Sequence, residues 1–398
     1  MSSEKLDISF ALPRIFKGHF TGGLYCILKH AHLLSEKGHS VNLIPYPGSE
    51  HPEWIECNAN FLLERSGLRT KLLRLGLERS LRKSNEFRAA VNSHSFQSRI
   101  RPSDITIATA CETAPMVHRH GRGARAYFMQ HFEPVFMEPG TPKFFAAAET
   151  YLLPLYKIAN SLWLADRVTA FLRQSGVEER VFQSINAVDL GIFRKLPVAA
   201  RRDSERRVVV ISYGGRKVAW KGFEEMAHAM NAARRALPDH EIEWRVYGSA
   251  CLPPDNSIAP YSGLGFLQTQ ELAKEYNRAD ILLSASWYES FPLFPIEAMA
   301  CGLATIATGK GTEDFAQHGR NCEIVESKNI DSIAKGLIKV VRDEGYRKKL
   351  ALNATQDAKA LSWENASDRM EQVIREVVEI HREKGAGPHS FESFVEHL

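Results

Sequence analysis

The chain has 398 residues, of which 44% are hydrophobic and 25% charged, and its formal net charge at pH 7 is +4. This length and composition predict a globular α/β protein of two domains. No apolar stretch reaches the roughly 18 residues that a membrane-spanning helix needs, and no motif for nucleic-acid recognition is present. The N-terminus lacks the basic-then-apolar order of a signal peptide, and the six scattered cysteines lack metal-type spacing, so we expect a cytoplasmic protein with reduced thiols.

The chain opens with the pattern strand, glycine turn, helix, strand. Residues 7–12 are typical of a buried strand, residues 24–34 carry apolar side chains at helical spacing, and residues 38–44 predict a second strand. Between the first strand and the helix stand Gly22 and Gly23, which would let backbone N–H groups approach an anion at the positive end of the helix. A glycine pair can also simply turn the chain, so the pattern alone indicates a nucleotide-type βαβ unit without naming its ligand.

Residues 61–101 combine ten basic residues with interleaved leucines. One reading is a helix that packs on the N-terminal domain and turns a solvated basic face outward. The other is a segment that lies on an anionic membrane surface, at the inner face of the membrane. The sequence leaves both readings open.

Two further strands are predicted at residues 104–109 and 126–129. Because carboxyl ends of parallel strands meet at one edge of a sheet, the loops after these strands should open beside Gly22 and Gly23. The second of these loops begins at Gln130 and His131, which makes His131 a candidate site residue.

Residues 196–207 have the composition of a linker, and a second series of strands and helices begins at Val208. The loop after its first strand holds Gly215, Arg216 and Lys221, whose residue types suit a pyrophosphate: glycines let the backbone close on it, and the cations form charge-assisted bonds. A strand ending at Gly248 and a short run ending at Phe266 follow.

Residues 284–308 read as strand end, loop, short helix and strand, which is the local pattern of a parallel α/β sheet. Glu289 should lie in the loop at the carboxyl end of a strand, and Glu297 in about the first turn of the helix, since proline is tolerated at a helix start. Carboxylates only accept hydrogen bonds, so the pair suits a hydroxyl-rich ligand. Either residue alone could equally be a solvated loop or helix-start carboxylate. We expect Trp287, Phe291 and Phe294 around both.

The spacing of Glu289 and Glu297 resembles the E-x7-E signature of family 4 of the retaining nucleotide-sugar glycosyltransferases, with residues 297–302 in the usual form. The chain departs from that signature at Ser290 and Pro292, and a hinge-like motif at residues 186–189 has Ala187 where the family has glycine. Residues 109–114 and 130–134 are closest in look to bacterial polysaccharide rhamnosyltransferases, which have Asp at the place of His131.

The resemblance implies a GT-B fold, with two Rossmann-like domains that face each other across a cleft. Its boundaries would be an acceptor-side domain at 1–195, a donor domain at 205–362, a helix at 363–384 that returns to the first domain, and a tail at 385–398. The resemblance further implies a sugar donor activated as a dTDP, UDP or GDP conjugate, a glycan acceptor that could be lipid-linked, retention of anomeric configuration, and no cofactor. No Asp-x-Asp occurs, so we expect no metal. The site residues it implies are His131 and Glu289 for catalysis and Gly22, Gly23, Gly215, Arg216, Lys221, Gly248, Phe266, Glu289 and Glu297 for the donor.

Two other functions fit the same sequence. A nucleotide-sugar epimerase or hydrolase of the same fold would turn over donor without an acceptor. A degenerate glycosyltransferase would bind nucleotide sugar as a scaffold, which the departures at Ser290, Pro292 and Ala187 keep open.

Overall fold

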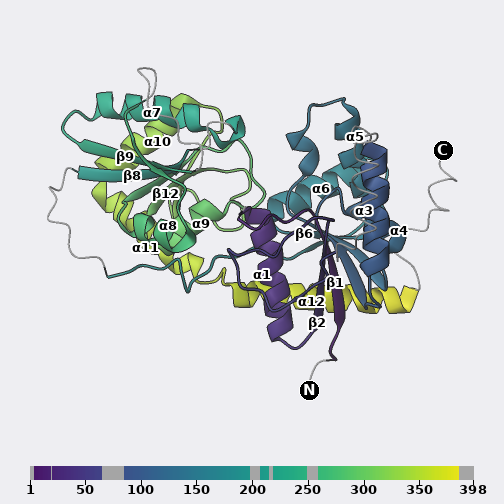
Figure 1. Cartoon of the computed structure of the whole chain (residues 1–398). Coiled ribbons are helices and arrows are strands. Elements are labelled where there is room, and N and C mark those ends of the chain that lie inside the picture. Colours follow the sequence, from purple (N-terminus) through teal and green to yellow (C-terminus); the bar gives the residue numbers. More distant parts are fainter. Residues whose placement is uncertain are drawn as a thin grey trace. The chain divides into compact units, whose positions relative to one another are not determined.

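The structure is a computed structural model that describes residues 4–18, 20–64, 85–197, 207–214, 218–248 and 259–384, with the backbone alone for residues 85–90. Contacts divide these residues into two compact units. The first takes in the described residues up to Asn160, Leu164 to Ile185, and those from Ala366 onward; the second takes in Ser161–Trp163 and Asn186–Asn365 (Figure 1). Within the described part of the chain, no helix is long and apolar enough to cross a membrane.

The first unit is built on a seven-stranded sheet of order β3-β2-β1-β4-β5-β6-β7, in which every pairing is parallel. The chain moves outward from β1 to β3 and then crosses back to β4, so the order reverses between β1 and β4. That reversal is the hallmark of a Rossmann-like sheet, and it opens a crevice at the carboxyl ends of these two strands. The strands are β1 (Asp7–Leu12), β2 (Ser40–Pro45), β3 (Asn60–Phe61), β4 (Ile105–Ala108), β5 (Ala124–Met129), β6 (Tyr156–Ala159) and β7 (Val181–Gln183).

Helices cover this sheet, and the last helix of the described chain is one of them. Helix α12 (Trp363–Lys384) buries Met370, Ile374 and Val377 in the same core as β1 and α1, although it follows the whole second unit in sequence (Figure 1). The predicted returning helix is therefore observed to pack on the first unit. The other helices of this unit are α1 (Gly22–Glu36), α3 (Asn85–Arg99), α4 (Ala114–His120), η1 (Glu133–Phe136), α5 (Pro142–Glu149), η2 (Thr150–Leu152) and α6 (Leu162–Gln174).

The sequence pattern did not predict strand β6, because a lysine interrupts its apolar run. Lys157 is fully buried, and its Nζ donates to the carbonyl oxygens of Leu153 (2.6 Å) and Leu155 (2.8 Å) and to Glu179 (2.9 Å). Burial lowers the pKa of Lys157, and the neighbouring Glu179 carboxylate opposes that shift. A buried cation is tolerated only with such partners, which the sequence alone does not reveal.

The second unit repeats the same topology in a six-stranded parallel sheet of order β10-β9-β8-β11-β12-β13. The order reverses between β8 and β11. Strands β8, β11 and β12 are buried on both faces, as their runs of β-branched and apolar residues predict. The strands are β8 (Arg207–Tyr213), β9 (Glu241–Tyr247), β10 (Ser262–Gly265), β11 (Ile281–Ser284), β12 (Ala304–Thr308) and β13 (Cys322–Val325).

Two sets of helices cover the second sheet. Helices α7 and α10 pack against each other over one face, and α9 packs with α8 and α11 over the other (Figure 1). The predicted α/β architecture of two parallel sheets is thus confirmed. The helices of this unit are η3 (Ala219–Lys221), α7 (Phe223–Ala236), α8 (Thr269–Asn277), α9 (Leu293–Ala300), α10 (Ile330–Arg342) and α11 (Glu344–Ala358).

Candidate active site

The candidate site lies at the carboxyl ends of β8 and β11, where the order of the second sheet reverses. Neighbouring strands on either side of such a reversal send their following helices to opposite faces, which leaves room for a ligand. The chain leaves β8 at Tyr213 and β11 at Ser284, and both Lys221 and Glu289 follow within a few residues of these ends.

Two glycines hold the loop after β11 from either side. Gly222 has φ of 71°, and a Cβ added to it would lie 2.0 Å from the carbonyl oxygen of Ala285. Gly311 has φ of 89°, and a Cβ there would lie 2.3 Å from the carbonyl oxygen of Glu289. Only glycine adopts this conformation at such close approach, so both positions require a residue without a side chain.

Hydrogen bonds fix the same loop between the glycine contacts. The Trp287 N–H donates to the carbonyl of Trp220 (2.7 Å), and the Thr308 hydroxyl donates to the carbonyl of Ser286 (2.6 Å). The Glu289 N–H donates to the carbonyl of Lys310 at 3.3 Å. The backbone around Glu289 is therefore placed by two other segments of the second unit, at residues 220–222 and 308–311.

The Glu289 side chain forms an ion pair with Lys221. The distance from Lys221 Nζ to Glu289 Oε1 is 2.5 Å, and the side chains keep only 18% and 12% of their surface exposed. Lys221 Nζ also lies 4.2 Å from the centre of the Trp220 ring, within the range of a cation–π contact. The two residues predicted to bind separate parts of a ligand thus contact each other directly.

Glu297 lies on α9, one turn further into the helix than predicted. The helix begins at Leu293, with Pro292 as its N-cap and Pro295 within the first turn, so Glu297 falls in the second turn. A proline is tolerated anywhere in the first turn, because those N–H groups have no partner within the helix. The carboxyl group of Glu297 is buried rather than exposed at the helix start.

Burial changes the chemistry of Glu297. The residue is 9% exposed, and its Oε2 has no hydrogen-bond partner among the described residues. Burial, and to a lesser extent the negative charge of Asp189, raise the pKa of this carboxyl to about 8. At neutral pH the group is therefore largely protonated and can both donate and accept a hydrogen bond.

The three aromatic residues expected around the two carboxylates make different contacts. Phe294 stacks on Tyr213 with ring centres 4.9 Å apart and lies beside Lys221. Phe291 instead packs against Phe315, and the Trp287 Nε1 donates to Glu225 at 2.6 Å. Of the three predicted neighbours, Phe294 is thus the one whose ring approaches Lys221.

Only some of the other residues of the second unit that were predicted to bind the sugar donor lie among the described residues. Gly248 follows β9, and its N–H donates to the carbonyl of Gly265 at 2.8 Å. Phe266 follows β10 and is 56% exposed, so its ring is accessible to a ligand. Gly215 and Arg216 lie outside the described residues.

In the first unit the structure brings Gly23 next to the loop that carries His131. A Cβ on Gly23 would lie 3.5 Å from the Cβ of Gln130, which follows β5. Gly22 and Gly23 open α1, as the glycine-turn pattern predicts. The His131 carbonyl accepts a hydrogen bond from the Tyr151 hydroxyl (2.7 Å), and its ring lies 4.4 Å from that of Phe136.

Glu133 is a further polar residue of this loop that sequence reasoning did not single out. Its Oε2 accepts a hydrogen bond from the N–H of Cys111 (2.7 Å), which joins the loop after β5 to the loop after β4. Burial raises the pKa of Glu133. Both loops were predicted to open on one edge of the sheet, but the carboxylate that ties them together could not be identified without their separation in space.

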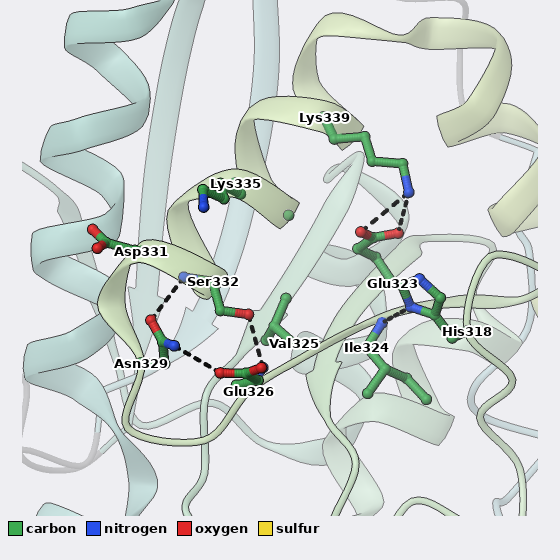
Figure 2. A pocket seen from close by; sticks show the side chains of 11 residues that line it. His318, Glu323, Ile324, Val325, Glu326, Asn329, Asp331, Ser332, Lys335 and Lys339 are labelled. Carbon is green, nitrogen blue, oxygen red and sulfur yellow. Dashed lines mark hydrogen bonds and ion pairs between the residues drawn. The ribbon is translucent and has the colours of Figure 1, made fainter.

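A hollow of about 480 Å³ lies elsewhere in the second unit, between β13 and the start of α10. Figure 2 shows that two of its carboxylates already have partners: Glu323 pairs with Lys339, and Glu326 accepts a hydrogen bond from Asn329. None of the predicted site residues lines it. The hollow is therefore not a candidate for the site predicted from the sequence.

Seven of the ten basic residues of segment 61–101 lie at positions 65–83, outside the described residues, which resume at Asn85. Arg101 is described and exposed, whereas Arg99 is held by hydrogen bonds. The Arg99 guanidinium donates to the carbonyls of Leu62 (2.7 Å) and Ser95 (3.0 Å), so this cation holds α3 to the chain before it. The prediction of a lipid-facing surface stays a prediction for the other residues.

Comparison with known proteins agrees with this geometry. The model of the family described as "Glycosyl transferases group 1" matches residues 207–343. The O-antigen biosynthesis protein RfbC of Myxococcus xanthus is 28% identical over 288 residues, which make up 68% of this chain and 21% of that protein. The D-inositol 3-phosphate glycosyltransferase of Rhodococcus jostii is 29% identical over 254 residues, 59% of this chain and 55% of the relative. The chain thus spans from a fifth to just over half of these relatives.

Solved structures show the same fold over nearly the whole chain. The sucrose-phosphate synthase of Thermosynechococcus elongatus has a TM-score of 0.70 at 16% identity, covering 94% of this chain and 99% of its own. Anabaena HepE, solved with UDP and glucose, has a TM-score of 0.65 at 14% identity, covering 93% of this chain and 100% of its own. The fold is therefore GT-B, as predicted. The similarity to group 1 glycosyltransferases rests on the family match over residues 207–343 and on the relatives named above.

The contact of Gly222 with Ala285 can be tested against a glycine of similar conformation. Gly176 has φ of 74° and open space where a Cβ would lie, so Gly176→Ala measures the backbone cost alone, about 1–2 kcal/mol. Gly222→Ala adds the clash with Ala285, and we expect it to lower the free energy of unfolding in urea by clearly more. Equal losses in the two variants would show that the loop does not depend on this contact.

The buried carboxyl of Glu297 predicts a pH dependence of stability. Its native pKa of about 8 exceeds the ordinary value of 4.5, so between these pH values the folded state binds more protons than the unfolded state. The contribution of Glu297 to the free energy of unfolding should therefore fall as pH rises, by at most about 1.4 kcal/mol per pH unit. Urea titrations at pH 5 to 8 should show the wild type losing stability relative to Glu297→Gln. A constant difference across this range would contradict the shift.

Proposed function

We propose that this protein transfers a sugar from a nucleotide diphosphate sugar to the glycan of a bacterial surface polysaccharide, or to a lipid-linked precursor of one. The observation that carries the proposal is the ion pair of Lys221 and Glu289 after strands β8 and β11, where the order of the second sheet reverses, with the buried Glu297 on the helix that follows the same loop. The group 1 match over residues 207–343 supports it, since that match covers these three residues.

The residue types fit the chemistry of such a transfer. Breaking the bond between sugar and phosphate builds negative charge on the departing diphosphate, and preorganised cations stabilise that charge without reorganisation. Lys221 is suited to this role, and Arg216 is proposed to share it. The Glu297 carboxyl would bind the ribose hydroxyls, and Glu289 a hydroxyl of the sugar. We propose that the reaction needs no metal ion and retains the anomeric configuration, with His131 near the reacting carbon.

Names of relatives and structural neighbours support the choice of acceptor. RfbC takes part in O-antigen biosynthesis, and the structural neighbour WaaB is a galactosyltransferase of the lipopolysaccharide outer core. HepE was solved with UDP-glucose, which supports a nucleotide-sugar donor. Rhamnose is our proposal for the sugar, on the resemblance of the loops after β4 and β5. The basic segment 61–101 would contact anionic lipid if the acceptor is lipid-linked.

The reaction can be tested by following donor consumption with and without acceptor. We expect loss of dTDP-rhamnose, or of a UDP- or GDP-sugar, only when a bacterial surface glycan or its lipid-linked precursor is present. NMR of the product should show the anomeric configuration of the donor, and turnover should continue in excess EDTA. Turnover of donor alone would favour an epimerase or hydrolase, and binding without turnover would favour a scaffold. Activity that EDTA abolishes and magnesium restores would overturn the metal-free proposal.

Donor binding gives a second test. Lys221→Gln and Arg216→Ala should each weaken nucleoside diphosphate binding roughly 10- to 150-fold, because each removes a charge-assisted bond worth about 1.5–3 kcal/mol. The matched control is Lys328→Gln, since Lys328 lies 3.9 Å over the Trp287 ring in the same region. Calorimetry that gives wild-type affinity for both site variants would show the diphosphate site to be wrongly assigned.

A further inference from the structure

We infer that Glu289 distinguishes the sugar-bearing donor from the free nucleoside diphosphate product, and so promotes product release. The inference rests on the proposed function, because it takes the donor to be a nucleotide diphosphate sugar. It concerns a different step, the selection between two ligands that share the same nucleotide. Glu289 is placed to act on both, since it contacts the cation proposed to hold their diphosphate.

The ion pair lies in a setting where charges interact strongly. Lys221 Nζ lies within 6.0 Å of the centres of the Tyr213, Trp220 and Phe294 rings, and little of either charged side chain is exposed. Partly buried charges are screened less by water and salt than exposed ones. A negative group that approaches Lys221 therefore also meets the field of Glu289.

The position of Glu289 is held by its backbone. Its carbonyl oxygen lies against Gly311, and its N–H donates to the carbonyl of Lys310. The carboxylate is thus anchored next to Lys221, with which it pairs at 2.5 Å and beside which it keeps 12% of its side-chain surface exposed. A fixed carboxylate stabilises a ligand that offers it a hydroxyl and repels one that offers only phosphate oxygen, because a carboxylate accepts hydrogen bonds and cannot donate them.

The two ligands differ in this respect. In the sugar nucleotide both phosphates are esterified, so the diphosphate carries about two negative charges, and the sugar supplies hydroxyl donors. During transfer the bond from the anomeric carbon to the phosphate oxygen breaks, and the electron pair stays on that oxygen. The acceptor oxygen bonds to the carbon, and its proton passes to the released diphosphate and then to solvent. The product carries roughly one more negative charge near pH 7.5 and has lost its sugar hydroxyls.

Chemistry therefore converts a ligand that Glu289 favours into one that it repels. Lys221 is required for both ligands, because each has a diphosphate. Glu289 makes the difference between them. Without its charge, Lys221 would hold the product more tightly, and the product would leave more slowly.

The test compares two affinities in one protein. Calorimetry at pH 7.5 gives Kd for UDP and UDP-glucose, dTDP and dTDP-rhamnose, and GDP and GDP-mannose, and the pair that the wild type binds best is used. In Glu289→Gln we expect the affinity for the free diphosphate to rise about tenfold relative to that for its sugar conjugate. Stopped-flow measurement should show the diphosphate dissociating more slowly. Glu289→Asp keeps the charge, so its affinity ratio should stay near the wild type.

A neighbouring carboxylate provides the matched control. Glu225 accepts from the Trp287 Nε1 in the same region and is not paired with Lys221, so Glu225→Gln should leave the ratio unchanged. An unchanged ratio in Glu289→Gln, or an equal change in Glu225→Gln, would overturn the inference while the proposed function stands. If the wild type binds none of the six ligands, the proposed function is wrong and the inference falls with it. Thermal melting of each variant confirms that the protein measured is folded.

Discussion

The placement of the loop after β11 is the constraint on which the candidate site depends. This loop carries Glu289, and it passes between Gly222 and Gly311 at distances that no side chain would allow. The two glycines belong to segments that follow β8 and β12, the neighbours of β11 in the sheet. Parallel pairing brings the three strand ends to one edge, and the glycines then let the backbone segments touch. The chemistry of the site is built on that backbone contact.

Burial gives the two glutamates of the motif different properties. Glu289 is charged beside a lysine, whereas Glu297 has no cation beside it among the described residues and its pKa is raised to about 8. Glu289 is therefore a hydrogen-bond acceptor beside the positive charge of Lys221. Glu297 is a carboxyl group that can both donate and accept a hydrogen bond. Two identical side chains eight positions apart can thus serve different parts of one ligand because their surroundings differ.

In the first unit, too, contacts between loops position a candidate site residue. Its loops after β4 and β5 are joined by the hydrogen bond from Cys111 to Glu133, and the Tyr151 hydroxyl fixes the backbone at His131. These contacts position His131 through the backbone, on the same sheet edge as the glycines that open α1. The returning helix α12 completes the core beneath this sheet, so the first unit depends on residues at both ends of the described chain.

The architecture could be predicted from the sequence, because apolar runs of strand length alternate with helical patterns, and parallel sheets follow from that alternation. The sequence also singled out Lys221, Glu289 and Glu297 as candidates, from a glycine-rich basic loop and from the spacing of the two glutamates. Local pattern did not reveal β6, whose buried Lys157 is tolerated only because Glu179 and two carbonyls surround it. The three-dimensional structure was needed to see that Lys221 and Glu289, 68 residues apart, form one ion pair and that Glu297 is buried. Distance and burial arise from packing between segments remote in sequence, and spacing along the chain does not encode them.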